Sequence, residues 1–423
     1  MNGSIELGRN FSKVSLFNET AGVEAFSGYI TINATDLTNY FFLLTKSKNI
    51  SQRETPLVLW LFGGPGLSSL MAQFLYNGPV AINATGNITQ RENTLTKFAD
   101  VIYLDQPAGA GFSFTNQTGY SQTMEQMSAN ILIFLEQFLQ IFPEYNGSDF
   151  YIAGESYAAR NAFHLGYTML VNETLNNSLS MSGVISGVPF LGPVLDMLDP
   201  TEFLYQVGML DANGKIQFEG IFQQIRELVN NKSSLNYTMM GLQLLSQTIL
   251  NTDPAAKTLY QNLTGFMFDA SALYSTMPSI IMLYYAVVNS TAVKRMLHVG
   301  ENASIEVARP LVVLNIAYGD FSRDLSNETG YVLNNTKVLN YYSQFDTVCP
   351  VVKSEEHFRN ITWIESRTFL NQSRSIVYKP NTTEVTHYRT DTTNLTYVLV
   401  TRAGHYVSLD KGPLVYRLIK EFV

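Results

Sequence analysis

Short runs of apolar residues recur along the chain with the length of single β-strands. Each run covers four to six residues, and many are rich in the β-branched and aromatic side chains that strands favour. The pattern predicts strands at residues 28–31, 40–44, 57–62, 100–105, 149–153, 181–185, 337–342 and 396–401. The later runs are apolar on both faces, which is typical of parallel strands covered by helices on each side.

Apolar residues at helical spacing lie between and after these strands. The spacing is clearest at residues 121–142 and 413–423, where Pro413 occupies a favourable first helical position. Alternating strands and helices predict an α/β fold with a mostly parallel central sheet. From residue 189 to 310 only the helical spacing remains. We therefore predict a core formed by residues 1–188 and 311–423, with a helical cap insertion at 189–310.

Composition and charge exclude several classes of protein. Of the 423 residues, 46% are hydrophobic and 15% charged, which provides a large core and excludes a disordered chain, a collagen or a coiled coil. The formal net charge is -8 and no long basic run occurs, so we expect no nucleic-acid partner. The longest apolar stretches, 131–142 and 279–288, are shorter than the roughly 20 residues of a membrane span. We expect no membrane span.

Acceptor motifs for N-linked glycans are far more frequent than chance provides. The pattern Asn-x-Ser/Thr occurs at 22 of the 34 asparagines, where chance would give about six. This excess favours a glycoprotein of the secretory pathway, extracellular or lysosomal/vacuolar, over a protein that merely has Asn-rich surface loops. The predicted glycosylation sites are Asn33, Asn49, Asn83, Asn87, Asn116, Asn146, Asn172, Asn236, Asn262, Asn289, Asn302, Asn327, Asn360, Asn371, Asn381 and Asn394.

Two other features bear on the compartment. The first residues, MNGSIELGRNF, lack the charged and then apolar pattern of a signal peptide, so we expect that one is missing from the chain as given. Cys349 is the only cysteine, which excludes an intrachain disulfide. We expect glycans, and not disulfides, to characterise this surface.

Ser156 is the first candidate for chemistry. It lies in the motif GESYA, residues 154–158, which directly follows a predicted strand and precedes a helical pattern. A serine on a sharp strand-to-helix turn is held in a strained, exposed position, and the small residues Gly154 and Ala158 let the turn close. Similar turns also join inert strands and helices, so the motif alone does not decide. The strand context favours Ser156 as a nucleophile.

His405 and Asp346 complete a candidate catalytic triad. His405 follows the predicted strand 396–401, and Asp346 follows the predicted strand 337–342. In an open α/β sheet such positions gather at the carboxyl edge, where ligands and catalytic groups lie. The alternatives are a loop histidine and an ordinary turn aspartate. The chain order Ser156, Asp346, His405 is the order expected of an α/β hydrolase.

A glycine-rich turn provides a candidate oxyanion hole. The motif FGGPG, residues 62–66, follows the predicted strand 57–62. Glycines let backbone amides approach a substrate without obstruction, although such a sequence can also be a mere turn. We assign the two oxyanion donors to the amides of Gly64 and of Tyr157, the residue after the nucleophile.

Five motifs together resemble the serine carboxypeptidase family, and most closely its vitellogenic carboxypeptidase-like branch. In chain order they are WLFGGPGLSSL, FADVIYLDQPAGAGFSF, FYIAGESYAAR, KVLNYYSQFD and AGHYVSLDKGP. The resemblance extends from about residue 26 to 423 and is weakest between 195 and 331. It implies an α/β-hydrolase fold with a helical cap and the release of C-terminal residues from peptides, usually at acid pH.

The resemblance also assigns residues to roles. It gives Ser156 as nucleophile, His405 as general base and then acid, and Asp346 as the residue that orients it. It implies that Glu155 helps to bind the substrate's C-terminal carboxylate through a shared proton, which explains an acid optimum. The candidate substrate-binding residues are Glu155, Phe62, Gly63, Tyr76 and Cys349.

The chain departs from the family where a C-terminal carboxylate is recognised. Phe62 stands where the family has Asn or Gln, and Tyr76 aligns with a second recognition glutamate. Ala159 replaces a common glycine after the nucleophile motif. Arg160, which comes next, is either a substitute charge for a substrate carboxylate or a solvated helix residue. Cys349 either lines a substrate pocket or is a small buried hydrophobic residue. These departures predict weakened or altered recognition of the carboxylate.

Two classes of function remain open. The first is a serine carboxypeptidase-like hydrolase acting on peptides, or an acyltransferase that passes the acyl group to an alcohol. The second is a catalytically weak or inactive, heavily glycosylated structural or storage protein on the same scaffold, because folds outlast the sites built on them. We expect no cofactor and no metal site. Both a monomer and a homo-oligomer fit the sequence.

Overall fold

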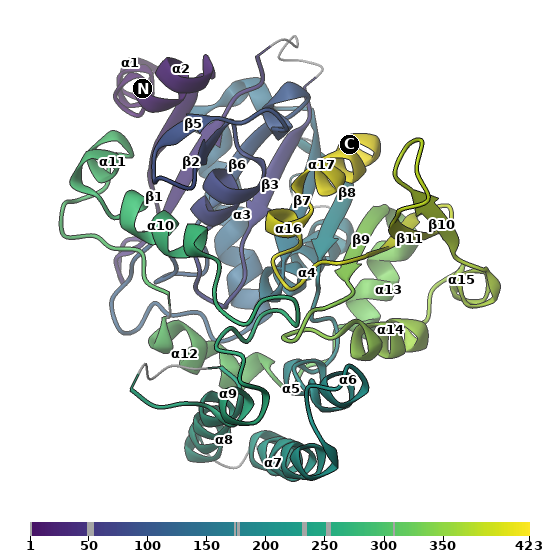
Figure 1. Cartoon of the computed structure of the whole chain (residues 1–423). Helices are drawn as coiled ribbons and strands as arrows, with labels where there is room; N and C mark the ends of the chain where they lie inside the picture. The colour runs from purple at the N-terminus through teal and green to yellow at the C-terminus, as the bar shows by residue number, and fades with distance from the viewer. Residues whose placement is uncertain are drawn as a thin grey trace.

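The computed structural model describes residues 2–48, 55–172, 175, 178–230, 235–250, 255–307 and 309–423. Within these residues, a sheet of ten strands runs through the molecule in the order β1-β2-β6-β3-β7-β8-β9-β12-β11-β10 (Figure 1). Its strands are β1 (Ala25–Asn33), β2 (Thr38–Thr45), β3 (Leu57–Leu61), β6 (Asp100–Leu104), β7 (Ser148–Glu155), β8 (Leu179–Gly187), β9 (Lys337–Ser343), β10 (Ser375–Tyr378), β11 (Val385–Asp391) and β12 (Leu395–Val400). A separate antiparallel hairpin is formed by β4 (Val80–Ile82) and β5 (Ile88–Gln90).

The centre of the sheet is parallel and its edges are antiparallel. Strands β6, β3, β7, β8, β9 and β12 pair in parallel, whereas β1 and β2 at one edge and β11 and β10 at the other pair antiparallel. This confirms the predicted α/β fold with a mostly parallel sheet. Each predicted strand overlaps one of these ten strands.

Both faces of the central strands are buried, as the apolar runs predict. In β3, Val58 and Trp60 pack on one side with Leu414 and Leu418 of α17 (Gly412–Phe422). Leu57, Leu59 and Leu61 pack on the other side with residues of α3 (Met124–Ile141) and α4 (Tyr157–Asn172). Burying an apolar side chain of this size stabilises the fold by about 1.5–3 kcal/mol. The sheet is thus a rigid platform between two helical layers.

The remaining described helices surround this platform. Outside residues 189–320, and besides α3, α4 and α17, they are α1 (Asn2–Phe11), α2 (Ser15–Ala21), α13 (Ser326–Asn335), α14 (Val351–Asn360), α15 (Ser366–Asn371) and α16 (Val407–Asp410). Short turns of helix occur at η1 (Ala72–Asn77), η2 (Leu95–Lys97) and η3 (Pro143–Tyr145). None of the described helices is long and apolar enough to cross a membrane.

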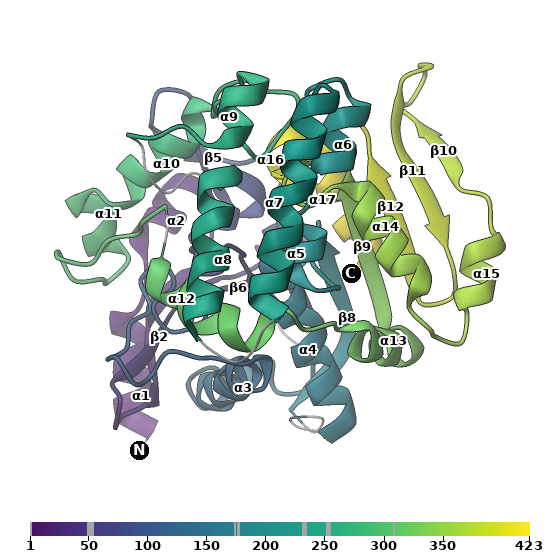
Figure 2. The same cartoon turned by 90° about the horizontal axis from the view of Figure 1, so that it is seen from below.

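Between residues 189 and 320 the described elements are all helices. They are α5 (Val194–Met197), α6 (Thr201–Gln206), α7 (Ala212–Asn230), α8 (Leu235–Thr248), α9 (Leu259–Thr264), α10 (Ser279–Val288), α11 (Thr291–Met296) and α12 (Pro310–Asp320). Most of them gather at the end of the sheet where β7 and β8 finish (Figure 1). Figure 2 shows α7 and α8 side by side across this end.

Candidate active site

Ser156 occupies a sharp turn between β7 and α4. Its φ angle of +59° lies in the left-handed region, which is unfavourable for a residue with a side chain and is typical of a nucleophile turn. The turn is so tight that a Cβ atom on Gly154 would lie 2.4 Å from the carbonyl oxygen of Ala158. The amide of Ser156 donates to the carbonyl of Gly187 at 2.9 Å, which ties the turn to the end of β8. The serine is therefore held by the backbone of two strands.

The structure brings His405 and Asp346 to this serine. The distance from His405 Nε2 to Ser156 Oγ is 2.9 Å, and the distance from His405 Nδ1 to Asp346 Oδ2 is 2.8 Å. Asp346 follows β9 and His405 follows β12, two neighbouring parallel strands. The other carboxylate oxygen of Asp346 accepts from the amides of Val348 and Cys349, each at 2.8 Å. Asp346 is thereby fixed in position beside the imidazole.

Opposing effects act on the pKa of His405. Burial disfavours the imidazolium ion and lowers the pKa, but the charge of Asp346 and its hydrogen bond outweigh burial, with smaller help from Glu155 and Asp269. The net result is a pKa raised above the ordinary value for histidine. The raised pKa makes the neutral imidazole of His405 a stronger base towards the serine proton, and Asp346 stabilises the imidazolium ion that then forms.

The glycine turn after β3 lies directly against the Ser156 turn. A Cβ atom on Gly63 would lie 2.8 Å from Ser156 Cβ and 2.9 Å from the amide nitrogen of Tyr157. Gly64 has a φ angle of +114°, a conformation that residues with side chains rarely adopt, and it is exposed. The two predicted oxyanion donors, Gly64 and Tyr157, therefore belong to adjoining backbone segments on one side of the serine.

Glu155 is buried next to the serine and is bound by two hydroxyl groups. Tyr341 and Ser408 both donate to its Oε1 atom, at 2.5 and 3.0 Å. Burial raises the pKa of Glu155 to about 7, although these hydrogen bonds and His405 act in the opposite direction. Since Oε1 already accepts two hydrogen bonds, a proton on this carboxyl group is placed best on Oε2.

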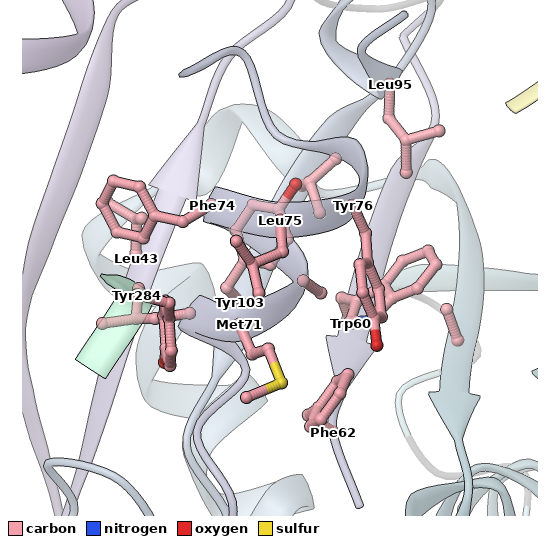
Figure 3. Close-up of a cluster of buried hydrophobic side chains, with 14 of the residues drawn as sticks. Leu43, Trp60, Phe62, Met71, Phe74, Leu75, Tyr76, Leu95, Tyr103 and Tyr284 are labelled. Carbon is pink, nitrogen blue, oxygen red and sulfur yellow. The ribbon is translucent and has the colours of Figure 1, made fainter. Parts of the chain in front are cut away.

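Phe62 and Tyr76 form an aromatic pair at the end of β3. Their ring centroids are 5.6 Å apart, and both side chains are 4% exposed. Figure 3 shows the Tyr76 hydroxyl pointing towards Phe62. Among the described residues this hydroxyl has no hydrogen-bond partner. Burial and then the charge of Glu155 raise the pKa of Tyr76 well above its ordinary value, so the hydroxyl keeps its proton. Tyr76 therefore offers one unused donor near Glu155.

Comparison with known proteins identifies the family. Residues 16–423 match the family described as serine carboxypeptidase. The chain belongs to this family. Among its relatives, the venom serine carboxypeptidase of Apis mellifera is 28% identical over 424 residues, which cover 100% of this chain and 88% of the relative. The vitellogenic carboxypeptidase of Aedes aegypti is 28% identical over 425 residues, covering 99% of this chain and 87% of the relative.

A solved structure supports the fold independently. The prohormone-processing carboxypeptidase of Saccharomyces cerevisiae superimposes with a TM-score of 0.79 at 19% identity, covering 98% of this chain and 96% of that one. This likeness confirms the predicted α/β-hydrolase fold. The family match makes this protein a serine-type carboxypeptidase-like hydrolase.

Arg160 has neither of the surroundings that the sequence suggested. The side chain is fully buried, so it is not a solvated helix residue. Its guanidinium binds the carboxylate of Asp320 through Nε at 2.9 Å and Nη2 at 3.0 Å. The other N–H groups donate to the carbonyl oxygens of Phe190, Gly192 and Arg323. All five donors are therefore engaged by protein groups, and none is left for a substrate carboxylate.

Ala159 and Cys349 are both buried. Ala159 lies in the first turn of α4, its amide donates to the Ser156 carbonyl at 3.0 Å, and α4 packs on β7 and β8. The fold thus accommodates alanine where the family commonly has glycine. Cys349 is 1% exposed, and its thiol contacts the carbonyl of Pro189 and the hydroxyl of Ser354. Burial, and then Asp346, raise the pKa of this thiol. These surroundings favour a small buried residue over a pocket-lining one.

Several residues that contact the candidate site do not stand out in the sequence. Tyr341 lies in β9, where a buried tyrosine has the same pattern as any core residue. Ser408 lies three residues after His405 in the motif AGHYVSLDKGP. Only this proximity to His405 could have identified it from the sequence. The ring of Phe190 faces the His405 ring at 6.4 Å. Two open surface hollows of about 630 Å³ lie elsewhere, and no triad residue lines either one.

The predicted glycosylation sites lie at the surface wherever the structure describes them. Asn49 lies outside the described residues. Twelve of the other fifteen asparagines are exposed, and Asn83, Asn289 and Asn394 are partly buried. Asn289 Nδ2 donates to the carbonyl of Ile305 at 2.8 Å, and Asn394 Nδ2 donates to that of Leu333 at 3.0 Å. The three partly buried asparagines are therefore less accessible than the others.

Proposed function

We propose that this protein is an active serine carboxypeptidase-like hydrolase that releases C-terminal residues from peptides, with altered recognition of the terminal carboxylate. Ser156, His405 and Asp346 act as its catalytic triad. The observation that carries the proposal is the position of His405, whose two ring nitrogens lie 2.9 Å from Ser156 Oγ and 2.8 Å from Asp346 Oδ2. A scaffold without catalytic activity has no need of this continuous set of contacts.

The contacts define the steps of the reaction. Asp346 accepts the Nδ1–H of His405, which leaves Nε2 free to take the proton of Ser156 while Oγ attacks the substrate carbonyl. The amides of Gly64 and Tyr157 receive the oxyanion of the tetrahedral intermediate. His405 then gives its proton to the leaving amine as the C–N bond breaks. Water repeats the sequence on the acyl-enzyme: it loses a proton to His405, and Ser156 leaves with that proton.

Recognition of the substrate's carboxylate is assigned to two neutral donors. Phe62 has no hydrogen-bond donor in its side chain. Tyr76 provides an unused hydroxyl, and Glu155 provides an Oε2–H group when it is protonated. Hydrogen bonds to charged groups contribute about 1.5–3 kcal/mol each, so losing one donor weakens binding at least about tenfold. We infer that discrimination between free and blocked C-termini is weak.

The proposal extends to the whole protein. Residues 189–310 act as a helical cap whose side chains select the substrate. The exposed acceptor asparagines carry N-linked glycans, and the protein acts in the secretory pathway, outside the cell or in a lysosome or vacuole. This assignment is supported by the surface positions of the acceptors and by relatives named for venom and for vitellogenesis.

Labelling with a fluorophosphonate probe tests the proposal. The glycosylated protein and its Ser156→Ala variant are treated at pH 5 and pH 7, and the adduct is located by mass spectrometry. Only an activated serine reacts readily, so we expect an adduct on Ser156 and none on the variant. Folded protein that is not labelled at either pH contradicts the proposal.

A labelled enzyme is then given three substrates that share one scissile bond: a free-acid peptide, its C-terminal amide and an ester. We expect a preference for the free acid of well under a hundredfold, because only Tyr76 and protonated Glu155 are assigned to bind the carboxylate. A preference for the free acid of a hundredfold or more contradicts that part of the proposal. Addition of an alcohol to the same assay separates hydrolysis from acyl transfer.

The second candidate function is a heavily glycosylated structural or storage protein. It is favoured by the density of surface acceptors and by the changes at Phe62 and Tyr76. The same labelling experiment separates it from the enzyme, because a structural protein with a normally folded α/β core leaves Ser156 unreactive.

A further inference from the structure

The buried pair of Arg160 and Asp320 joins three segments that are distant in sequence. Arg160 lies one turn after Ser156 on α4, and Asp320 is the last residue of α12. Phe190 and Gly192, whose carbonyls accept from Arg160 at 2.7 Å each, lie in the segment that follows β8. Both charged side chains are fully buried. The pair therefore sits where the proposed cap leaves the core and where it returns.

Full burial makes the geometry of this pair costly to disturb. A buried charge loses its hydration, and only complete pairing and hydrogen bonding repay that loss. Here the carboxylate of Asp320 is bound bidentately, and the remaining guanidinium N–H groups donate to three backbone carbonyls. A planar guanidinium with five fixed donors holds its acceptors at defined positions. The groups that it contacts are therefore fixed relative to α4.

Two residues bound by this pair, Tyr157 by Asp320 and Phe190 by Arg160, also belong to or contact the proposed catalytic centre. The hydroxyl of Tyr157 donates to Asp320 Oδ2 at 2.7 Å, and Tyr157 supplies a proposed oxyanion amide. The carbonyl of Phe190 is held by Arg160, and the ring of Phe190 faces that of His405 at 6.4 Å. Within the described structure, neither Arg160 nor Asp320 forms a hydrogen bond with Ser156, His405 or Asp346, which makes them candidates for an indirect role.

We propose that Arg160 and Asp320 are positioning residues, which hold Tyr157 so that its amide faces the oxyanion and hold Phe190 against His405. The inference rests on the proposed hydrolase function. An oxyanion donor acts through alignment with charge that exists only in the transition state, so a small displacement of Tyr157 lowers kcat more than it changes substrate binding. It leaves the protonation of His405 unaltered, since the bond to Asp346 is not involved.

The test removes one hydroxyl from each of two tyrosines on α4. Tyr157→Phe deletes the hydrogen bond to Asp320 and keeps both the ring and the backbone amide. Tyr167→Phe, ten residues later on the same helix, deletes a hydroxyl from a partly exposed ring and serves as the matched control. For each protein, the rate constant of fluorophosphonate labelling at Ser156 is measured, with kcat, KM and the pH profile on a neutral chromogenic ester.

For Tyr157→Phe we expect kcat and the labelling rate constant to fall about tenfold to a hundredfold, the range of one hydrogen bond to a charged group. KM should stay within twofold of the wild-type value. The midpoint of the pH profile should stay within about 0.3 pH units of that of wild type. The control should match wild type in every measurement. Equal rates for the two variants, or a loss confined to KM, overturn the inference.

Asp320→Asn provides a second variant with the same shape and no charge. Thermal unfolding shows whether it folds, and a folded Asp320→Asn protein with the wild-type labelling rate also overturns the inference. If it does not fold, the comparison of the two tyrosine variants decides alone. A wild-type protein that is not labelled at Ser156 has a different meaning: it overturns the proposed function and this positioning role with it.

Discussion

The carboxyl group of Glu155 connects burial at a single residue to the pH dependence of the whole reaction. Its pKa is raised to about 7 because it is buried, so the group is protonated below that pH and ionised above it. The protonated form can donate to a substrate carboxylate, whereas the ionised form repels it. Raising the pH through about 7 therefore removes one donor and adds one negative charge to the carboxylate site.

We predict that the ratio of kcat/KM for a free-acid peptide to that for its amide falls as the pH rises through about 7. Taking the ratio cancels the titration of His405, which both substrates share. In Glu155→Gln the side chain stays neutral at every pH, so the ratio should be flat between pH 5 and 8. A ratio that keeps its wild-type pH dependence in the variant assigns the titration to another group.

A second prediction concerns the unused hydroxyl of Tyr76. Removing it with Tyr76→Phe breaks no hydrogen bond within the described structure, because this buried hydroxyl has no partner there. We expect stability to stay within about 0.5 kcal/mol of wild type or to rise, and KM for free-acid peptides to increase about tenfold. Chemical denaturation and initial-rate kinetics measure the two quantities. An unchanged KM excludes the hydroxyl from substrate binding.

At the scale of elements, the turn between β7 and α4 depends on the absence of one side chain. A Cβ atom on Gly154 would lie 2.4 Å from the Ala158 carbonyl oxygen, and backbone atoms cannot move aside as a flexible side chain does. We predict that Gly154→Ala destabilises the fold by about 1–3 kcal/mol and abolishes labelling of Ser156. Gly28→Ala in β1 is the control, since a Cβ there meets nothing within 4 Å and stability should change by less than about 0.5 kcal/mol.

The central strands that position this site are also the elements that are predicted best from the sequence. Central parallel strands are buried on both faces. They therefore appear in the sequence as short apolar runs, which can be recognised without knowing which strands pair with them. The edge strands β10 and β11 escaped prediction because β10 has only four residues, and β11 mixes polar with apolar residues and so forms no apolar run. The hairpin of β4 and β5 has three residues in each strand, too few for a period to be visible.

Within the site, too, the residues identified by a local sequence pattern are predicted, and those whose role depends on a distant partner are not. Ser156, Asp346 and His405 follow three predicted strands in a known order, so local patterns place them at one edge of the sheet. Arg160 was misassigned because its partner is distant: Asp320 lies 160 residues away, and no local pattern reveals a pair of that separation. A lone arginine on a helix is most often solvated, and only the packed fold shows that this one is buried.

At the scale of the whole molecule, the proposed glycans have to find room on the surface around one compact core. An asparagine can carry a sugar in the folded protein only if one N–H of its Nδ2 atom faces solvent, because the sugar takes the place of that hydrogen. Asn289 and Asn394 are partly buried, and each donates from Nδ2 to a backbone carbonyl of another segment. Asn371 and Asn381 are exposed, and no Nδ2 hydrogen bond of theirs appears within the described structure.

We predict that Asn371 and Asn381 are occupied in protein produced through the secretory pathway of a eukaryotic cell, and that Asn289 and Asn394 are not. Enzymatic removal of the glycans in heavy-oxygen water converts each occupied asparagine to a labelled aspartate, which peptide mass spectrometry counts site by site. Full occupancy at Asn289 contradicts the described packing of that segment, in which the partly buried side chain donates from Nδ2 to the carbonyl of Ile305. Absence of label at every site contradicts the secretory assignment and leaves the abundance of acceptor motifs as a feature of an unmodified, Asn-rich surface.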